Sequence, residues 1–189
     1  DGIDVAYAYT TLHHPSLSHA FINAVLFLDY GRTGFPYPII PFTVNCYGRH
    51  VVSRRGFASP TPEATADPPS PSPRRMMDVG ASLGRFFAAH DLRAVLMASS
   101  SWSHAFLCDK TWQLRPDTPA DRRVYQAMVD GDHESLRSVT LAEIEDAGQH
   151  ELLNWFPLFG AMAELGKPLR WSHFVASDVF NSNKVFAAY

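Results

Sequence analysis

The sequence is poor in cysteine and has no long apolar run. Two cysteines, Cys46 and Cys108, in 189 residues are too few for a disulfide framework, and neither belongs to a CxxC pair of the kind found in zinc and redox sites. The longest apolar run, residues 24–28, is far shorter than the roughly 20 residues of a membrane span. We therefore expect a reduced, cytoplasmic protein that does not cross a membrane.

An excess of one charge is also missing. The 16 Lys and Arg residues nearly balance the 19 Asp and Glu residues, so the net charge of -3 gives no electrostatic footprint for nucleic acid or for an anionic membrane. No GxSxG elbow, P-loop or GxGxxG follows a predicted strand, which removes the commonest hydrolase, nucleotidase and dinucleotide-binding signals. With 46% hydrophobic residues, the chain should fold and act on a small molecule.

Apolar segments alternate between strand-like and helix-like patterns. We expect buried strands at 3–7, 41–45 and 92–98, and helices at 18–28, 76–90, 120–129, 140–148 and 150–165. This order predicts an α/β fold, with residues 1–189 forming a single three-layer domain whose central mixed sheet is flanked by helices. Six prolines fall between residues 53 and 75, so that stretch is predicted to be a surface excursion.

The first predicted strand begins at residue 3. A core strand in that place usually has neighbours that are encoded before it, which favours a fragment lacking its N-terminal part. An ordinary edge strand explains the pattern equally well.

Histidines follow two of the predicted strands. His13, His14 and His19 come after the first strand, and His104 comes after the strand at 92–98. Strand ends meet in α/β sheets, and a histidine with a pKa near 6.5 serves as a general acid or base or as a metal ligand. A capping or hydrogen-bonded surface role is the alternative for any one of them. For His19 and His104 together, the functional interpretation is favoured.

Glu151 is the other unusual residue. The predicted helix that follows it is apolar on nearly every face, so its carboxylate is expected to be carried inward, where it needs a partner, a proton or a metal. Helix-start carboxylates are also common because the macrodipole favours them, and the sequence does not decide between the two. Cys46 and Cys108 lack a basic partner in the sequence, which favours a packing role for both.

Four segments carry a family resemblance. They are residues 18–21 (SHAF), 37–45 (YPIIPFTVN), 99–106 (SSSWSHAF) and 149–155 (QHELLNW). In order and spacing they resemble the class III extradiol ring-cleaving dioxygenases, the superfamily of the catalytic subunit of protocatechuate 4,5-dioxygenase. The resemblance extends from residue 4 to about residue 165.

The resemblance implies a non-haem Fe(II) held by two histidines and one glutamate, with open positions for a catechol and dioxygen. Glu151 matches the carboxylate ligand, and His19 matches the acid/base that takes and returns a catechol proton. His104, Ser103 and Asn45 are expected to line the substrate pocket or to support it from behind. The expected partners are a small aromatic acid and dioxygen, and by analogy a second copy of the chain or a second subunit.

One departure from the family pattern is serious. The two iron-binding histidines of the family lie ahead of the first predicted strand, and His13 and His14 do not match their motifs. The fragment hypothesis gains support, and this chain alone is expected to bind iron weakly or not at all. Two alternatives stay open: a catalytically silent binding or regulatory member of the superfamily, and a zinc-dependent hydrolase-like relative.

Overall fold

The computed structural model describes residues 2–10, 16–48, 51–52 and 67–189. They belong to two compact units, Asp1–Thr43 and Val44–Tyr189. His13, His14 and most of the predicted surface excursion at 53–75 lie outside the described residues. A single domain over residues 1–189 stays a prediction. Among the described helices, none combines the length and the hydrophobicity that a membrane crossing requires.

The first unit contains the helix α1 (His19–Leu28), which begins where the sequence predicts. The carbonyl of Ser18 accepts the first helical hydrogen bonds, but the Ser18 side chain makes no capping bond. After the helix, the carboxylate of Asp29 accepts hydrogen bonds from the backbone N–H groups of Thr33 (2.8 Å) and Gly34 (2.9 Å). This Asp29 turn ends the helix.

The second unit is mainly helical. Its α-helices are α2 (Pro73–Ala88), α3 (Thr118–Asp130), α4 (His133–Ser138), α5 (Leu141–Asp146) and α6 (Phe156–Glu164), and its 3₁₀ helices are η1 (Ala105–Leu107), η2 (Asp109–Thr111) and η3 (His150–Asn154). Helix α3 has Pro119 in its first turn, and α5 begins with a capping box of Thr140 and Glu143. The structure confirms the predicted helices at these two places. Both starts could be predicted because a first-turn proline and a capping box act within a few residues.

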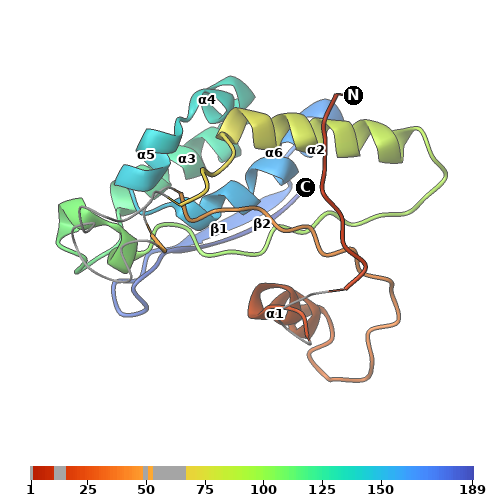
Figure 1. Ribbon diagram of the computed structural model, residues 1–189, viewed down its shortest axis with the longest axis horizontal. Helices are drawn as coiled ribbons and strands as arrows, with labels where there is room; N and C mark the ends of the chain where they lie inside the picture. The colour runs from red at the N-terminus through yellow and green to blue at the C-terminus, as the bar shows by residue number, and fades with distance from the viewer. Residues whose placement is uncertain (1, 11–15, 49–50, 53–66) are drawn as a thin grey trace. The chain divides into compact units, whose positions relative to one another are not determined.

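Helices α2 and α6 lie side by side and form the main packing of this unit (Figure 1). Phe156 and Phe159 of α6 are fully buried. Two glycines allow the close approach: a Cβ at Gly80 would collide with the carbonyl of Pro157, and one at Gly160 would collide with the carbonyl of Met77. The helix contact therefore depends on glycine at both positions.

The helix predicted at 150–165 is divided into two elements. The 3₁₀ helix η3 occupies its first turn, and α6 begins only at Phe156. Pro157 explains the division, because proline has no N–H to donate and its ring would clash with the carbonyl four residues earlier in a continuous α-helix. As a result, Glu151 lies on a tight 3₁₀ turn ahead of the buried helix.

The sheet is small. Strands β1 (Trp171–Val175) and β2 (Lys184–Ala188) pair antiparallel, with Trp171 opposite Ala188 and Val175 opposite Lys184. The combination of helices and strands is broadly α/β, as predicted, but a central mixed sheet is not shown.

The predicted strands at 3–7, 41–45 and 92–98 are not strands in the described part of the chain. The segment at 92–98 instead leaves Val95 87% exposed. An apolar pattern shows which side chains a strand would bury, but a strand also needs a neighbour for its backbone hydrogen bonds. The pattern alone does not supply that neighbour.

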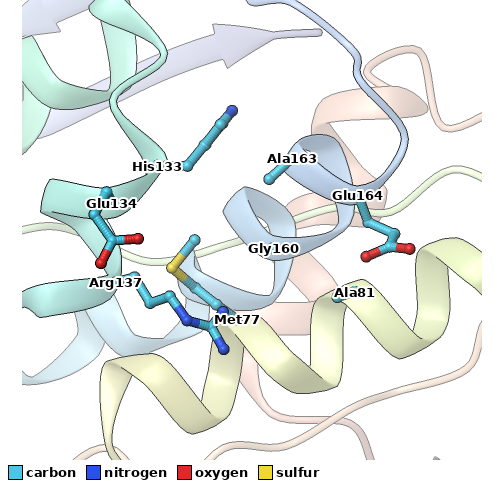
Figure 2. A pocket seen from close by; sticks show the side chains of 8 residues that line it. All are labelled: Met77, Ala81, His133, Glu134, Arg137, Gly160, Ala163 and Glu164. Atoms are coloured by element: carbon cyan, nitrogen blue, oxygen red, sulfur yellow. The ribbon is translucent and has the colours of Figure 1, made fainter.

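A cavity of about 250 Å³ lies between α2, α4 and α6 (Figure 2). It is lined by Met77, Ala81, His133, Glu134, Arg137, Gly160, Ala163 and Glu164. Two of its charged side chains are engaged elsewhere, since Arg137 pairs with Asp78 and Glu164 pairs with Arg85. None of the predicted site residues lines this cavity.

Candidate functional site

Glu151 lies on η3, at the edge of the buried core of the second unit. The next two residues, Leu152 and Leu153, are fully buried, whereas the side chain of Glu151 is 25% exposed. The backbone carbonyl of Glu151 accepts hydrogen bonds from the Ser100 hydroxyl (2.8 Å) and the Asn154 amide (3.1 Å). The backbone is therefore anchored on both sides while the carboxylate stays accessible.

Two side chains contact the Glu151 carboxylate. The Tyr47 hydroxyl donates a hydrogen bond to Oε1 at 3.0 Å, and His104 Nε2 lies 3.2 Å from Oε2. The backbone N–H of His104 also donates to the carbonyl of Gly148 at 2.9 Å. The structure thus joins two segments that the sequence analysis singled out separately, 99–106 and 149–155.

The neighbouring Tyr47 and Cys46 are both protonated at neutral pH, and their pKa values are raised further. Burial, with the Glu151 charge as a second cause, raises the pKa of the Tyr47 hydroxyl to about 12. The same two causes raise the pKa of the Cys46 thiol to about 12. Tyr47 therefore remains a hydrogen-bond donor at neutral pH. Cys46 remains a thiol, as expected for a packing residue, and both it and Cys108 are free and buried.

Behind these residues, the carboxylate of Asp121 on α3 is completely buried and connects three segments. Its Oδ1 accepts from Gln149 Nε2 at 2.7 Å, and its Oδ2 accepts from Asn183 Nδ2 at 2.7 Å. The backbone N–H of Ser103 lies 3.2 Å from both oxygens. Each of these partners is one or two residues from a residue at the site, so Asp121 fixes the relative positions of His104, Glu151 and β2.

The pKa of Asp121 is unusually high for a carboxyl group. Burial raises its pKa to about 6, against the lowering effect of the hydrogen bonds from Gln149, Asn183 and Ser103. The ionised form accepts all of these hydrogen bonds, and the cost of burying its charge is only partly offset by them.

Ser103 and Asn45 both have structural partners. Ser103 is fully buried, and its hydroxyl accepts a hydrogen bond from the backbone N–H of Asp117 at 2.6 Å. Asn45 donates to the carbonyls of Pro68 (3.0 Å) and Pro69 (3.3 Å), which fixes the loop before α2. Ser103 was predicted either to line the substrate pocket or to support it from behind. Its complete burial favours the second role, next to His104.

His19, the predicted acid/base, is the first residue of α1 and is exposed within the first unit. His104 and Glu151 belong to the second unit. Because His19 belongs to the other unit, its role as the acid/base beside Glu151 stays a prediction.

A strand pairing connects His104 to the start of β2. His104 and Ser182 form an antiparallel bridge, and the N–H of Trp102 donates to the carbonyl of Asn183 at 3.1 Å. Lys184, the first residue of β2, donates through Nζ to the carbonyl of Ser182 (3.3 Å) and to its hydroxyl. A lysine that the sequence analysis did not single out is thus held next to the residue paired with His104.

The described residues do not make up the ligand set of two histidines and one glutamate. No group of three or more His, Cys, Asp or Glu side chains with metal-site spacing occurs among them. Around Glu151 the side chains in contact with the carboxylate offer one imidazole beside the carboxylate itself, and the nearby Cys46 is buried. This part of the chain therefore fits one or two metal ligands and not a complete site.

The sequence analysis did not single out three residues near the site: Tyr47, Asp121 and Lys184. Asp121 had a local signal, because it falls in line with the buried Val124 and Met128 along one face of α3, where a carboxylate is unexpected. Tyr47 had none, since its role comes from Glu151, which is distant in the sequence.

The comparisons with known proteins identify one family. The family described as the catalytic LigB subunit of aromatic ring-opening dioxygenase matches residues 60–187, which is well over half of the chain. The matched range includes His104, Asp121, Glu151 and Lys184, and it leaves out His19 and Asn45. Searches of the curated proteins and of the solved structures gave no match. The chain therefore belongs to the family of the catalytic LigB subunit of aromatic ring-opening dioxygenase.

Proposed function

We propose that this chain takes part in extradiol cleavage of a catechol-type aromatic acid by dioxygen at a non-haem Fe(II) site. In such a reaction the ring bond next to the two hydroxyls breaks, and both oxygen atoms of dioxygen enter the product. The observation that carries the proposal is the Glu151 carboxylate, anchored through its backbone, partly exposed and contacted by His104 within the range that matches the family.

Glu151 is the proposed carboxylate ligand of the metal. Tyr47 supports this role because its hydroxyl holds Oε1 at 3.0 Å and keeps its proton at neutral pH. A hydrogen bond of this kind fixes the orientation of a ligating carboxylate. His104 is assigned to proton transfer, so both histidine ligands of the proposed site are assigned to other residues.

Proton transfer is assigned to a histidine. The family resemblance favours His19 as the acid/base. The geometry favours His104, which is 15% exposed and beside the proposed ligand. A neutral imidazole accepts a proton from a catechol hydroxyl and returns it later. Single substitutions of His19 and His104 separate the two assignments.

The proposed setting is the cytoplasm, where the two free cysteines remain reduced. A homodimer or a two-subunit assembly is proposed only by analogy with the family.

The test is oxygen uptake by the full-length protein on a panel of catechols, with the metal content measured on the same preparation. Iron together with oxygen uptake and a coloured ring-opened product supports the proposal. Zinc without oxygen uptake supports the hydrolase-like relative instead. A folded protein with no metal and no turnover supports the silent binding member.

A further inference from the structure

Phe106 is a half-exposed aromatic residue beside the candidate site. It lies on the 3₁₀ helix η1 and is 55% exposed, whereas its neighbour Ala105 is buried. The centroid of its ring is 5.1 Å from that of the His104 imidazole, and the two rings are tilted by 53°. Because His104 Nε2 contacts the Glu151 carboxylate, an open aromatic surface adjoins the imidazole of the site.

The backbone that carries Phe106 is held by two other segments. The N–H of Ala105 donates to the carbonyl of Asn181 at 2.8 Å. The N–H of His104 donates to the carbonyl of Gly148 at 2.9 Å, and Gly148 packs so closely that a Cβ there would lie 2.7 Å from the His104 carbonyl oxygen. The backbone under the ring is therefore already in place, so less ordering is needed when a ligand binds.

A second aromatic residue borders the same carboxylate. Tyr47 is 39% exposed, and its hydroxyl donates to Oε1 of Glu151, while His104 contacts Oε2. The accessible surface around the Glu151–His104 pair thus contains two aromatic rings and a small number of polar groups. That is the usual composition of a binding site for a small aromatic molecule.

We propose that Phe106 packs against the ring of the aromatic substrate and holds that ring beside the Glu151–His104 pair. This inference rests on the proposed function and adds to it the residue that recognises the ring, as distinct from its hydroxyls. A catechol whose hydroxyl lies at hydrogen-bond distance from the His104 imidazole brings its ring near a side chain that contacts the same imidazole. Two aromatic rings gain from offset-stacked or edge-to-face packing beyond the burial of apolar area.

The experiment measures binding and turnover of catechol by the full-length wild-type protein and three variants. Phe106→Leu keeps an apolar side chain but removes the aromatic ring, and Phe106→Tyr keeps the ring. Phe86→Leu, on α2, is the matched control, because Phe86 is 48% exposed and its ring also stacks on an imidazole, that of His90 at 4.2 Å. Anaerobic calorimetry gives Kd, oxygen uptake gives kcat and KM, and iron content is measured on the same samples.

For Phe106→Leu, Kd and KM for catechol should rise roughly 2- to 10-fold, because aromatic pairs contribute on that scale, while kcat and iron content change little. Phe106→Tyr and Phe86→Leu should match the wild type. An unchanged Kd in Phe106→Leu overturns the inference. A fall in kcat or iron content without a rise in Kd also overturns it, because Phe106 would then only support His104 and Glu151.

The outcomes separate this inference from the proposed function. Wild-type protein that binds catechol more tightly than Phe106→Leu does, but consumes no oxygen, contradicts the proposed function and supports the inference. Normal oxygen uptake with an equal Kd in all four proteins supports the proposed function and overturns the inference. Wild-type protein that binds no catechol overturns both.

Discussion

His104 Nε2 lies 3.2 Å from Oε2 of Glu151, although 47 residues separate the two in the sequence. The contact is supported from behind, where Asp121 holds the residue before His104 and the residue two before Glu151. Both side chains keep some exposure. An imidazole and a carboxylate are thus presented together on a rigid base, as a site that handles metal and protons requires.

The acid/base assignment predicts a large loss of turnover from one histidine substitution. If the residue is His19, His19→Ala should lower kcat by about 10²- to 10⁴-fold; if it is His104, His104→Ala should do so. Steady-state oxygen uptake across pH measures the effect, and circular dichroism checks the fold. His173→Ala, on the exposed side of β1, is the control. Unchanged turnover in both variants would remove both assignments.

Tyr47→Phe removes a single hydroxyl and its hydrogen bond to Glu151. We expect iron affinity or turnover to fall about tenfold, because the partners that orient a ligating carboxylate contribute on that scale. Competition with a chelator measures the affinity. Tyr37→Phe, at an exposed tyrosine of the first unit, provides the comparison. Equal iron retention and turnover in the two variants would show that the Tyr47 hydroxyl is dispensable.

The raised pKa of Asp121 predicts that the free energy of unfolding depends on pH. Because burial raises its pKa from 3.8 to about 6, the folded state binds this proton more tightly than the unfolded state does. The contribution of Asp121 to the free energy of unfolding therefore decreases as the pH rises from about 4 to about 6, by on the order of 3 kcal/mol, and is constant above that range.

The measurement is urea unfolding of the wild type and of Asp121→Asn at several pH values. The difference in free energy of unfolding between the two proteins should change within this window and level off above it. Asp130→Asn, at the exposed end of the same helix, should show no such change. A difference that is independent of pH between 4 and 6 would contradict the assignment of a raised pKa to Asp121.

Because α2 and α6 pack closely, substitutions at two glycines of α2 should destabilise the protein to different extents. Gly80→Ala places a Cβ against the Pro157 carbonyl and should lower the free energy of unfolding by about 1–3 kcal/mol or more. Gly84→Ala meets its nearest atom, the Ala161 carbonyl oxygen, at 3.3 Å and should cost much less. Thermal unfolding measures both. Equal costs would mean that the helices separate freely.

Local signals in the sequence predicted local structure well. The capping box of Thr140 and Glu143 and the first-turn proline of α3 each act within a few residues, so their effect could be predicted directly. Pro157 was an equally local signal that was overlooked, and it divides the helix predicted at 150–165. The segment at 92–98 shows the limit, because strand formation there depends on a partner elsewhere in the chain.

The site was predicted only in part. Glu151 and His104 were singled out by pattern and by resemblance, but the contact between them required the structure. Tyr47 reaches Glu151 across 104 residues, and Asn183 reaches Asp121 across 62. Contacts over such separations are fixed by the tertiary packing, which no local pattern encodes.

The central claim is that Glu151 is a metal ligand of a ring-opening dioxygenase. The most direct test is the iron content of the full-length protein, wild type against Glu151→Ala, with oxygen uptake on a catechol measured on the same samples. Glu134→Ala, at an exposed glutamate of α4, is the control. We predict that Glu151→Ala loses bound iron and oxygen uptake together while Glu134→Ala keeps both. Full iron occupancy in Glu151→Ala would contradict the claim.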